Sequence, residues 1–107
     1  MNLHSESTDR LFKAILRLEN LDDCYKFFED LCTIKELQDM AQRLDAAVLL
    51  YEGVSYQNIA KQVNISSATI CRVNKCLTYG DGGYRTAIEK MKQEETPKNE
   101  SADTGNK

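Results

Sequence analysis

Residues 55–77, SYQNIAKQVNISSATICRVNKCL, constrain the fold of this chain more than any other segment. They divide into two short helical patterns that are separated only by "NIS". Ser55 and Ser66 stand directly before these patterns, where a serine hydroxyl can accept a hydrogen bond from a backbone N–H of the first helical turn. The segment therefore predicts helices over about 56–63 and 67–77. Two short helices joined by a tight turn are the skeleton of a helix-turn-helix.

The residue types inside this segment support the same motif. Ala60 lies midway along the first helix, where the second helix is expected to cross closely and a larger side chain would clash. Asn64 occupies the turn position that is expected to need left-handed backbone, which Asn tolerates better than most residues other than Gly. The alternative is an ordinary helical hairpin, which requires neither the small Ala60 nor a turn followed by a cap. The residues expected to be buried between the two helices and the rest of the domain are Ile59, Val63, Ile65, Ile70 and Val73.

Four further helices are predicted, so the fold class is all-α. Apolar residues recur at helical spacing over about 7–18, 22–32 and 34–52, and again over about 84–92 after "GDGG". Thr33 and Glu36 match a capping box at the start of the long helix, and Gly53 follows its end. We expect one six-helix domain over residues 1–92, with the helix-turn-helix at about 55–77. The remainder, 93–107, lacks large apolar residues and is predicted to be a disordered acidic tail.

Charge is distributed unevenly along the chain. The net charge is -3, but residues 51–92 carry six basic and three acidic residues, whereas residues 1–50 carry ten acidic and six basic ones. No Asp or Glu occurs between Tyr56 and Leu77. An acid-free helix-turn-helix favours binding to a polyanion, because a carboxylate there would face the phosphates of nucleic acid.

The second helix of such a motif enters the major groove of DNA with its N-terminal end. Ser and Thr hydroxyls there can bond to base edges or phosphates, Ala can contact a thymine methyl group, and Arg can bind guanine. Gln57, Lys61 and Lys75 are expected to contact the phosphate backbone, which positions a protein without reading sequence. For each lysine the alternative is an ordinary solvated surface charge. The candidate DNA-binding residues are Gln57, Lys61, Ser66, Ser67, Ala68, Thr69, Cys71, Arg72 and Lys75.

From about Thr33 to Leu77 the chain resembles the bacterial tryptophan (Trp) repressor family, and more closely its YerC/YecD branch. The segment TIKELQDMAQRLDAAVLLYEG is similar to the long central helix of the family, and SYQNIAKQVNISSATICRV to its DNA-reading unit. The most specific piece is "SATICR", and "YGDGGY" at 79–84 resembles a mark of the branch. The resemblance implies a Trp-repressor-like six-helix domain that forms an intertwined homodimer, with two reading heads on one side of the DNA.

The resemblance also implies a ligand site beside the reading head. Thr33, Arg43 and Arg72 match positions that bind L-tryptophan in the repressor, so Arg72 is a candidate for both sites. Val73 stands where the repressor has Gly, and Cys76 stands where it has Ser. A β-branched side chain in place of Gly fills the space that an indole ring needs. We therefore expect no L-tryptophan, and instead either a smaller corepressor or a dimer that binds DNA without any cofactor.

The expected function is a sequence-specific transcriptional regulator, a repressor, that binds double-stranded DNA as a homodimer. The alternative is a dimeric protein-interaction module of the same fold without tight DNA binding. An enzyme is not expected, because the only His is His4 and the chain has no Gly-rich phosphate loop and no general base beside a thiol. No catalytic residues are therefore assigned.

The remaining features predict a cytoplasmic protein. No apolar run is long enough to span a membrane, and the first ten residues lack the apolar core of a signal peptide. The four cysteines, Cys24, Cys32, Cys71 and Cys76, have no metal-site spacing. We expect them to be free thiols that mostly act as small core residues, with no bound metal.

Overall fold

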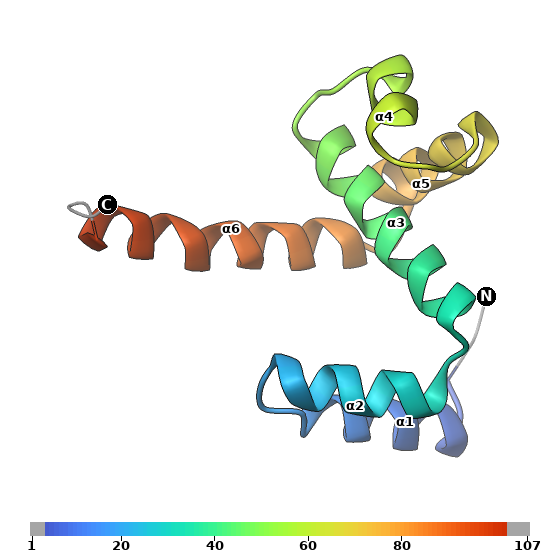
Figure 1. Ribbon diagram of the computed structural model, residues 1–107, viewed down its shortest axis with the longest axis vertical. Helices are drawn as coiled ribbons and strands as arrows, with labels where there is room; N and C mark the ends of the chain where they lie inside the picture. The colour runs from blue at the N-terminus through green and yellow to red at the C-terminus, as the bar shows by residue number, and fades with distance from the viewer. Residues whose placement is uncertain (1–3, 103–107) are drawn as a thin grey trace. The chain divides into compact units, whose positions relative to one another are not determined.

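The computed structural model describes the backbone of residues 4–102 and the side chains of residues 4–94. This part of the chain consists of six helices and contains no strand, which confirms the all-α prediction (Figure 1). The chain forms two compact units, one up to Gln38 and one from Asp39 onward. None of the described helices is both long and apolar enough to cross a membrane. In chain order the helices are α1 (Glu6–Leu16), α2 (Leu21–Leu31), α3 (Ile34–Tyr51), α4 (Tyr56–Gln62), α5 (Ser67–Tyr79) and α6 (Gly83–Ala102).

Side-chain caps start α3, α4 and α5, as predicted. The Ser55 hydroxyl accepts a hydrogen bond from the Asn58 N–H at 3.3 Å and starts α4. The capping box of α3 is complete: the Thr33 N–H donates to the Glu36 carboxylate at 2.8 Å, and the Glu36 N–H donates to the Thr33 hydroxyl at 3.0 Å. Gly53 follows α3 with φ +86°, a backbone conformation that only Gly adopts without strain.

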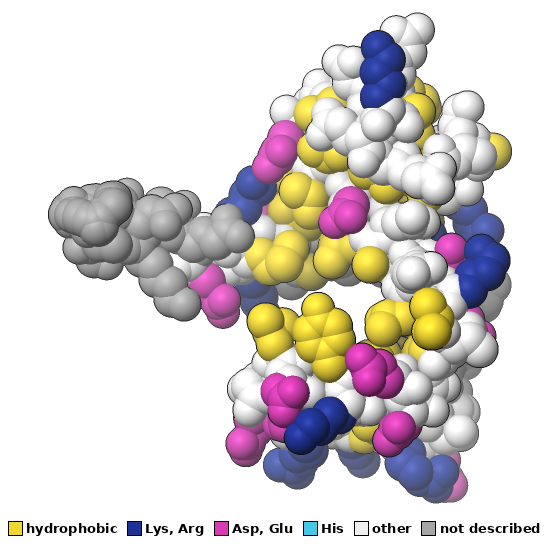
Figure 2. All heavy atoms as spheres, in the orientation of Figure 1, with side chains coloured by type: hydrophobic (Ala, Val, Ile, Leu, Met, Phe, Trp, Pro, Cys, Tyr) yellow, Lys and Arg dark blue, Asp and Glu magenta, His cyan; other side chains and the backbone are white. Residues whose placement is uncertain are grey.

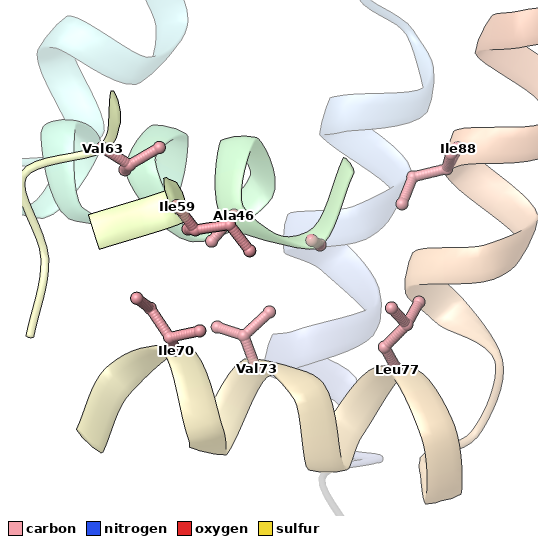
Figure 3. Close-up of a cluster of buried hydrophobic side chains, with 8 residues drawn as sticks. Ala46, Ile59, Val63, Ile70, Val73, Leu77 and Ile88 are labelled. Carbon is pink, nitrogen blue, oxygen red and sulfur yellow. The ribbon is translucent and has the colours of Figure 1, made fainter. Parts of the chain in front are cut away.

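The core of the C-terminal unit lies where α3, α4, α5 and α6 meet (Figure 3). Ile70, Val73 and Leu77 form one row along α5 and face residues of α3, α4 and α6. The burial predicted for the helix-turn-helix is confirmed, with Ile65 partly buried. Burying a side chain of this size contributes about 1.5–3 kcal/mol to folding. The complete buried set is Ala46, Ala47, Ile59, Val63, Ile70, Val73, Leu77 and Ile88.

Ala60 does not have the role predicted for it. Its side chain is exposed, and the neighbouring Ile59 is the fully buried residue of α4. The small residues buried in this core belong to α3 instead, where Ala46 and Ala47 are completely inaccessible. Alanines on a helix face allow close approach of other helices. Because Ile59 faces the core, Ala60, about 100° further around α4, faces solvent.

The turn between α4 and α5 also differs from the prediction. Asn64 was expected in left-handed backbone, but in the described part of the chain positive φ values occur only at glycines. The turn instead closes through a hydrogen bond from the Ile65 N–H to the Val63 carbonyl at 2.8 Å. A three-residue turn with negative φ at its central residue, here Asn64, is an inverse γ-turn. Asn64 is therefore free of backbone strain.

Helix α6 begins at Gly83 and continues to Ala102, so the predicted helix end at Lys92 was too early. The prediction required apolar residues that could pack on a core, and these stop after Met91. Gln93, Glu94 and Glu95 follow Lys92 directly, and their good intrinsic propensity can extend a helix that is already nucleated. Pro97 has no N–H and is unfavourable in a helix interior, so intrinsic propensity does not explain the last turns of α6. Residues 103–107 of the predicted tail lie outside the described part of the chain.

The N-terminal unit leaves its apolar side chains accessible. Neither α1 nor α2 contains a buried residue, although both helices are amphipathic. Leu16 is 80% exposed and Leu21 is 76% exposed. Apolar side chains are visible at the surface of this unit over α2 (Figure 2). A stable monomer rarely leaves so many large apolar side chains open to water.

Candidate nucleic-acid interface

Helices α4 and α5 present one exposed face opposite the buried residues that join them. Ile59 and Ile70 are both fully buried, so each helix has one side turned into the core. The structure leaves eight of the nine predicted DNA-binding residues exposed and half-buries Thr69. The exposed eight are Gln57, Lys61, Ser66, Ser67, Ala68, Cys71, Arg72 and Lys75.

Ser66 and Thr69 fix the N-terminal end of α5. The Ser66 hydroxyl accepts a hydrogen bond from the Thr69 N–H at 3.2 Å and lies 3.0 Å from the Thr69 hydroxyl. These bonds engage both hydroxyls within the protein. Ser67 and Ala68 follow directly on the exposed surface, at the end of α5 where the helix dipole is positive.

The surface of α4 and α5 carries positive charge only. Lys61, Arg72 and Lys75 are exposed, and no acidic residue occurs in either helix. Acidic residues return at Glu52, before α4, and at Asp81, after α5. The exposed face therefore combines hydroxyl groups, a methyl group and three cations, which are the groups that contact phosphates and base edges.

A pocket of about 370 Å³ lies beside this face, between α3, α5 and the start of α6. It brings together Arg43 and Arg72, two of the three predicted ligand residues. Thr33, the third, does not line it, because Thr33 caps α3 and lines another pocket with residues of α2. Sequence reasoning missed Tyr84 in this site, although the aromatic residue directly after "GDGG" was a visible signal. The pocket is lined by Arg43, Thr69, Arg72, Val73, Cys76 and Tyr84.

The pocket is electropositive. It has two guanidinium groups and no carboxylate among its lining residues. Neither Arg43 nor Arg72 forms an ion pair with any residue that the structure describes. Val73 belongs to both the pocket and the core, with only 2% of its surface exposed. The pocket can therefore accept an anion, and its apolar wall is set by a side chain that the core holds in place.

The cysteines differ from the prediction in their burial. Cys71 and Cys76 lie exposed on α5, and Cys24 and Cys32 are half-buried. None of the four is a fully buried core residue. In α5 the buried positions are Ile70, Val73 and Leu77, which leaves Cys71 and Cys76 on the exposed sides of the helix. All four are free thiols. No cluster of metal-ligating side chains occurs among the described residues.

The segment after α5 has two glycines with clear structural reasons. A Cβ at Gly80 would collide with the backbone carbonyl oxygen of Cys76. Gly82 adopts φ +90°, which other residues rarely adopt. The "GDGG" break therefore lets the chain turn sharply from α5 into α6, and this places Tyr84 at the pocket.

A polar network links the carboxyl ends of α3 and α5 to α6. The Arg85 Nε–H donates a hydrogen bond to the Leu77 carbonyl at 3.1 Å, and its guanidinium lies 5.8 Å from the centre of the Tyr51 ring. The Tyr51 hydroxyl donates to the Glu89 carboxylate at 3.1 Å. This hydrogen bond is the main reason that the pKa of Tyr51 is raised above its ordinary value of 10.0, and desolvation adds to the effect.

Comparisons with known proteins agree with this fold. The family model described as "Trp repressor protein" matches residues 6–92. The uncharacterized protein YerC of Bacillus subtilis is 47% identical over 94 residues, which cover 88% of this chain and 90% of that protein. The crystal structure of a TrpR-like protein from Eubacterium eligens superimposes with a TM-score of 0.81 at 44% identity, covering 83% of this chain and 92% of that one. A structure from Staphylococcus aureus also gives a TM-score of 0.81, at 41% identity, with 84% and 90% covered.

Proposed function

The chain belongs to the Trp repressor family, and we propose that it is a homodimeric, sequence-specific DNA-binding regulator that represses transcription. The observation that carries this proposal is the exposed, acid-free surface of α4 and α5 beside a rigidly capped α5. A surface with three cations and no carboxylate favours contact with a polyanion, and it stands out because the rest of the chain is acidic. No enzymatic role is proposed.

In this proposal α5 reads the major groove with its first two turns. Ser67 and Ala68 contact base edges, because they are exposed and their backbone is held by the cap at Ser66. Cys71 lies one turn further along the exposed side of the same helix. Lys61 and Lys75 bind phosphates and set the register of the protein on the duplex. Gln57, Ser66, Thr69 and Arg72 complete the proposed DNA-binding set.

The second subunit is proposed to cover the apolar surface of α1 and α2. These helices contain no buried residue in the single chain, and a chain of 107 residues has little core of its own. Burial of side chains such as Leu16 and Leu21 against a second copy would offset the conformational entropy that both helices lose when they form. A two-fold dimer would then present two α5 helices to half-sites about 34 Å apart.

The pocket beside α5 is proposed to bind a small anion that regulates DNA binding. Arg43 and Arg72 supply two guanidinium groups without ion-pair partners among the described residues, which suits a carboxylate or phosphate group. Val73 stands where the family resemblance places a Gly that lets the indole approach, so L-tryptophan is not the proposed ligand. Thr33 remains a candidate for this site only through the family resemblance.

A fragment selection followed by a salt titration tests the DNA-binding proposal. Purified protein without added ligand should enrich a near-palindromic sequence from genomic fragments. Affinity for that sequence should fall steeply with salt, because each phosphate contact releases counterions. Lys75→Gln should reduce the slope of log affinity against log salt by about one, whereas Lys13→Gln, with the same charge change on α1, should leave it unchanged. No enrichment with or without small anions would refute the proposal.

A second candidate is a dimeric protein-interaction module with the same fold. The observation that favours it is the modest charge of the reading surface, three cations in a chain of net charge -3. Such a module would bind DNA weakly and without sequence preference. The same titration separates the two, since weak binding of equal strength to all fragments supports the module.

A further inference from the structure

Arg85 occupies a position that connects three helices at the carboxyl end of α5. Its Nε–H donates to the Leu77 carbonyl, which lies in the last turn of α5 where carbonyls have no partner within the helix. This hydrogen bond is part-buried. The same guanidinium lies over the ring of Tyr51, in the last turn of α3. One side chain of α6 therefore holds the end of α5 and the end of α3 together.

The other two contacts of this network join α6 to the end of α3. Tyr51 donates its hydroxyl proton to Glu89, one turn after Arg85. Lys92 forms an ion pair with Glu52 at 2.7 Å, one turn further. Arg85 is thus the member of the network that reaches α5. Its removal would leave α6 attached to α3 and Leu77 packed in the core, but the carboxyl end of α5 would lose this hydrogen bond to α6 and become looser.

We infer that Arg85 is a positioning residue for DNA recognition, which fixes the angle at which α5 is presented, through its contacts with Leu77 and Tyr51. This inference rests on the proposed function. Leu77, which Arg85 contacts, lies about 15 Å along α5 from Ser67 at the reading end, at a rise of 1.5 Å per residue. A small change of angle at Leu77 is therefore amplified at Ser67. A tilt of about 10° at the carboxyl end would move the reading end by roughly 3 Å, about the length of one hydrogen bond.

The angle of α5 matters most for the distance between the two half-sites. Each subunit of a dimer holds its own α5, so a looser angle changes the separation of the two reading ends. A loosened dimer should tolerate half-site spacings that the native dimer rejects. A change that only destabilises the fold would weaken binding to every spacing by the same factor.

The test compares Arg85→Gln with Lys92→Gln in the full-length protein. Both variants lose one positive charge from α6, and Lys92→Gln also cuts a contact between α6 and α3, so it is a matched control. The ratio of affinities for the selected DNA sequence and for versions with one base pair added or removed between half-sites is measured at constant salt. We expect Arg85→Gln to lower this ratio by at least about fivefold. Lys92→Gln should leave the affinity ratio at its native value. Arg85→Lys should lower the ratio less than Arg85→Gln does, because a lysine ammonium can still donate to the Leu77 carbonyl.

Amide hydrogen exchange of the free protein provides a second measurement that does not depend on DNA. Exchange in the last turns of α5 should be faster in Arg85→Gln than in Lys92→Gln, while α4 remains unchanged. If the native protein binds no DNA sequence, the proposed function fails, and faster exchange in α5 still supports the contact between Arg85 and this helix. An unchanged spacing ratio in a variant that binds DNA overturns the inference, and so does exchange equal to that of Lys92→Gln. If Arg85→Gln does not fold, the same comparisons are made with Arg85→Lys, whose ratio should lie between native and fivefold lower.

Discussion

Replacing Val73 by Gly tests the architecture of the pocket and the reading helix together. Val73 is 98% inaccessible in the core of the C-terminal unit, and it also lines the pocket with Arg43 and Arg72. Its side chain has three carbon atoms that Gly lacks, and each buried carbon contributes about 0.8 kcal/mol. Gly within a helix costs roughly 0.4 kcal/mol more than Val. We therefore expect Val73→Gly to lower the free energy of unfolding by about 3 kcal/mol.

This loss is large but compatible with folding. Domains of this size are stable by roughly 5–15 kcal/mol, so the variant should remain folded at 25 °C with a lower denaturation midpoint. Val73→Ala is the matched control, because it removes two of the three carbons and keeps good helix propensity. Because Ala also has a better helix propensity than Val by roughly 0.6 kcal/mol, Val73→Ala should cost only about 1 kcal/mol and open less of the pocket.

The ligand measurement follows from the same geometry. Titration calorimetry should give no heat for L-tryptophan with the native protein and measurable binding with Val73→Gly, because the indole gains the space of the missing side chain. Saturation at a hundred times the dissociation constant should then restore about 2.7 kcal/mol of stability to the variant.

Two results would refute this reasoning. Tryptophan binding by the native protein would mean that Val73 does not close the pocket. A folded Val73→Gly protein that shows neither heat nor a ligand-dependent rise in stability would mean that another side chain, with Tyr84 the nearest candidate, occupies the space.

Three further predictions concern the cap, the polar network and the dimer. Ser66→Ala should lower the free energy of unfolding by about 1 kcal/mol, measured by urea denaturation, and should weaken DNA binding without changing its salt slope; equal stability of variant and native protein would contradict the role of the cap. Because the hydrogen bond to Glu89 raises the pKa of Tyr51 in the folded protein, its contribution to stability is complete below about pH 10 and is lost as the pH rises through the raised pKa. Tyr51→Phe should therefore have a lower free energy of unfolding than the native protein at pH 8. Above about pH 10 this difference should shrink, because the native protein loses the contribution of the hydrogen bond and the variant never had it. A difference in the free energy of unfolding that does not change with pH would argue against the contact. Leu16→Glu should shift the protein to monomers in sedimentation experiments, whereas Arg17→Glu, on the neighbouring exposed position, should not; a dimer that survives Leu16→Glu would place the interface elsewhere.

Local rules in the sequence determined the secondary structure and most of the burial. Ser55, Ser66 and the pair Thr33–Glu36 predicted helix starts correctly, since a cap is formed by residues three positions apart that meet in any surroundings. The spacing of apolar residues likewise predicted the buried faces of α4 and α5. The resemblance to the family rests on the same local segments.

Features that depend on packing between distant segments needed the tertiary structure. The complete burial of Ala46 and Ala47 depends on which helices pack against α3, and the backbone of Asn64 depends on how the turn closes between two packed helices. The meeting of Arg43 with Arg72 and Tyr84, and the contact of Arg85 with Leu77 and Tyr51, join three helices each. Sequence spacing fixes which residues share a helix face, because that is a property of one helix. Which faces meet is decided by the burial of all four helices of the C-terminal unit together, and no single segment contains that information.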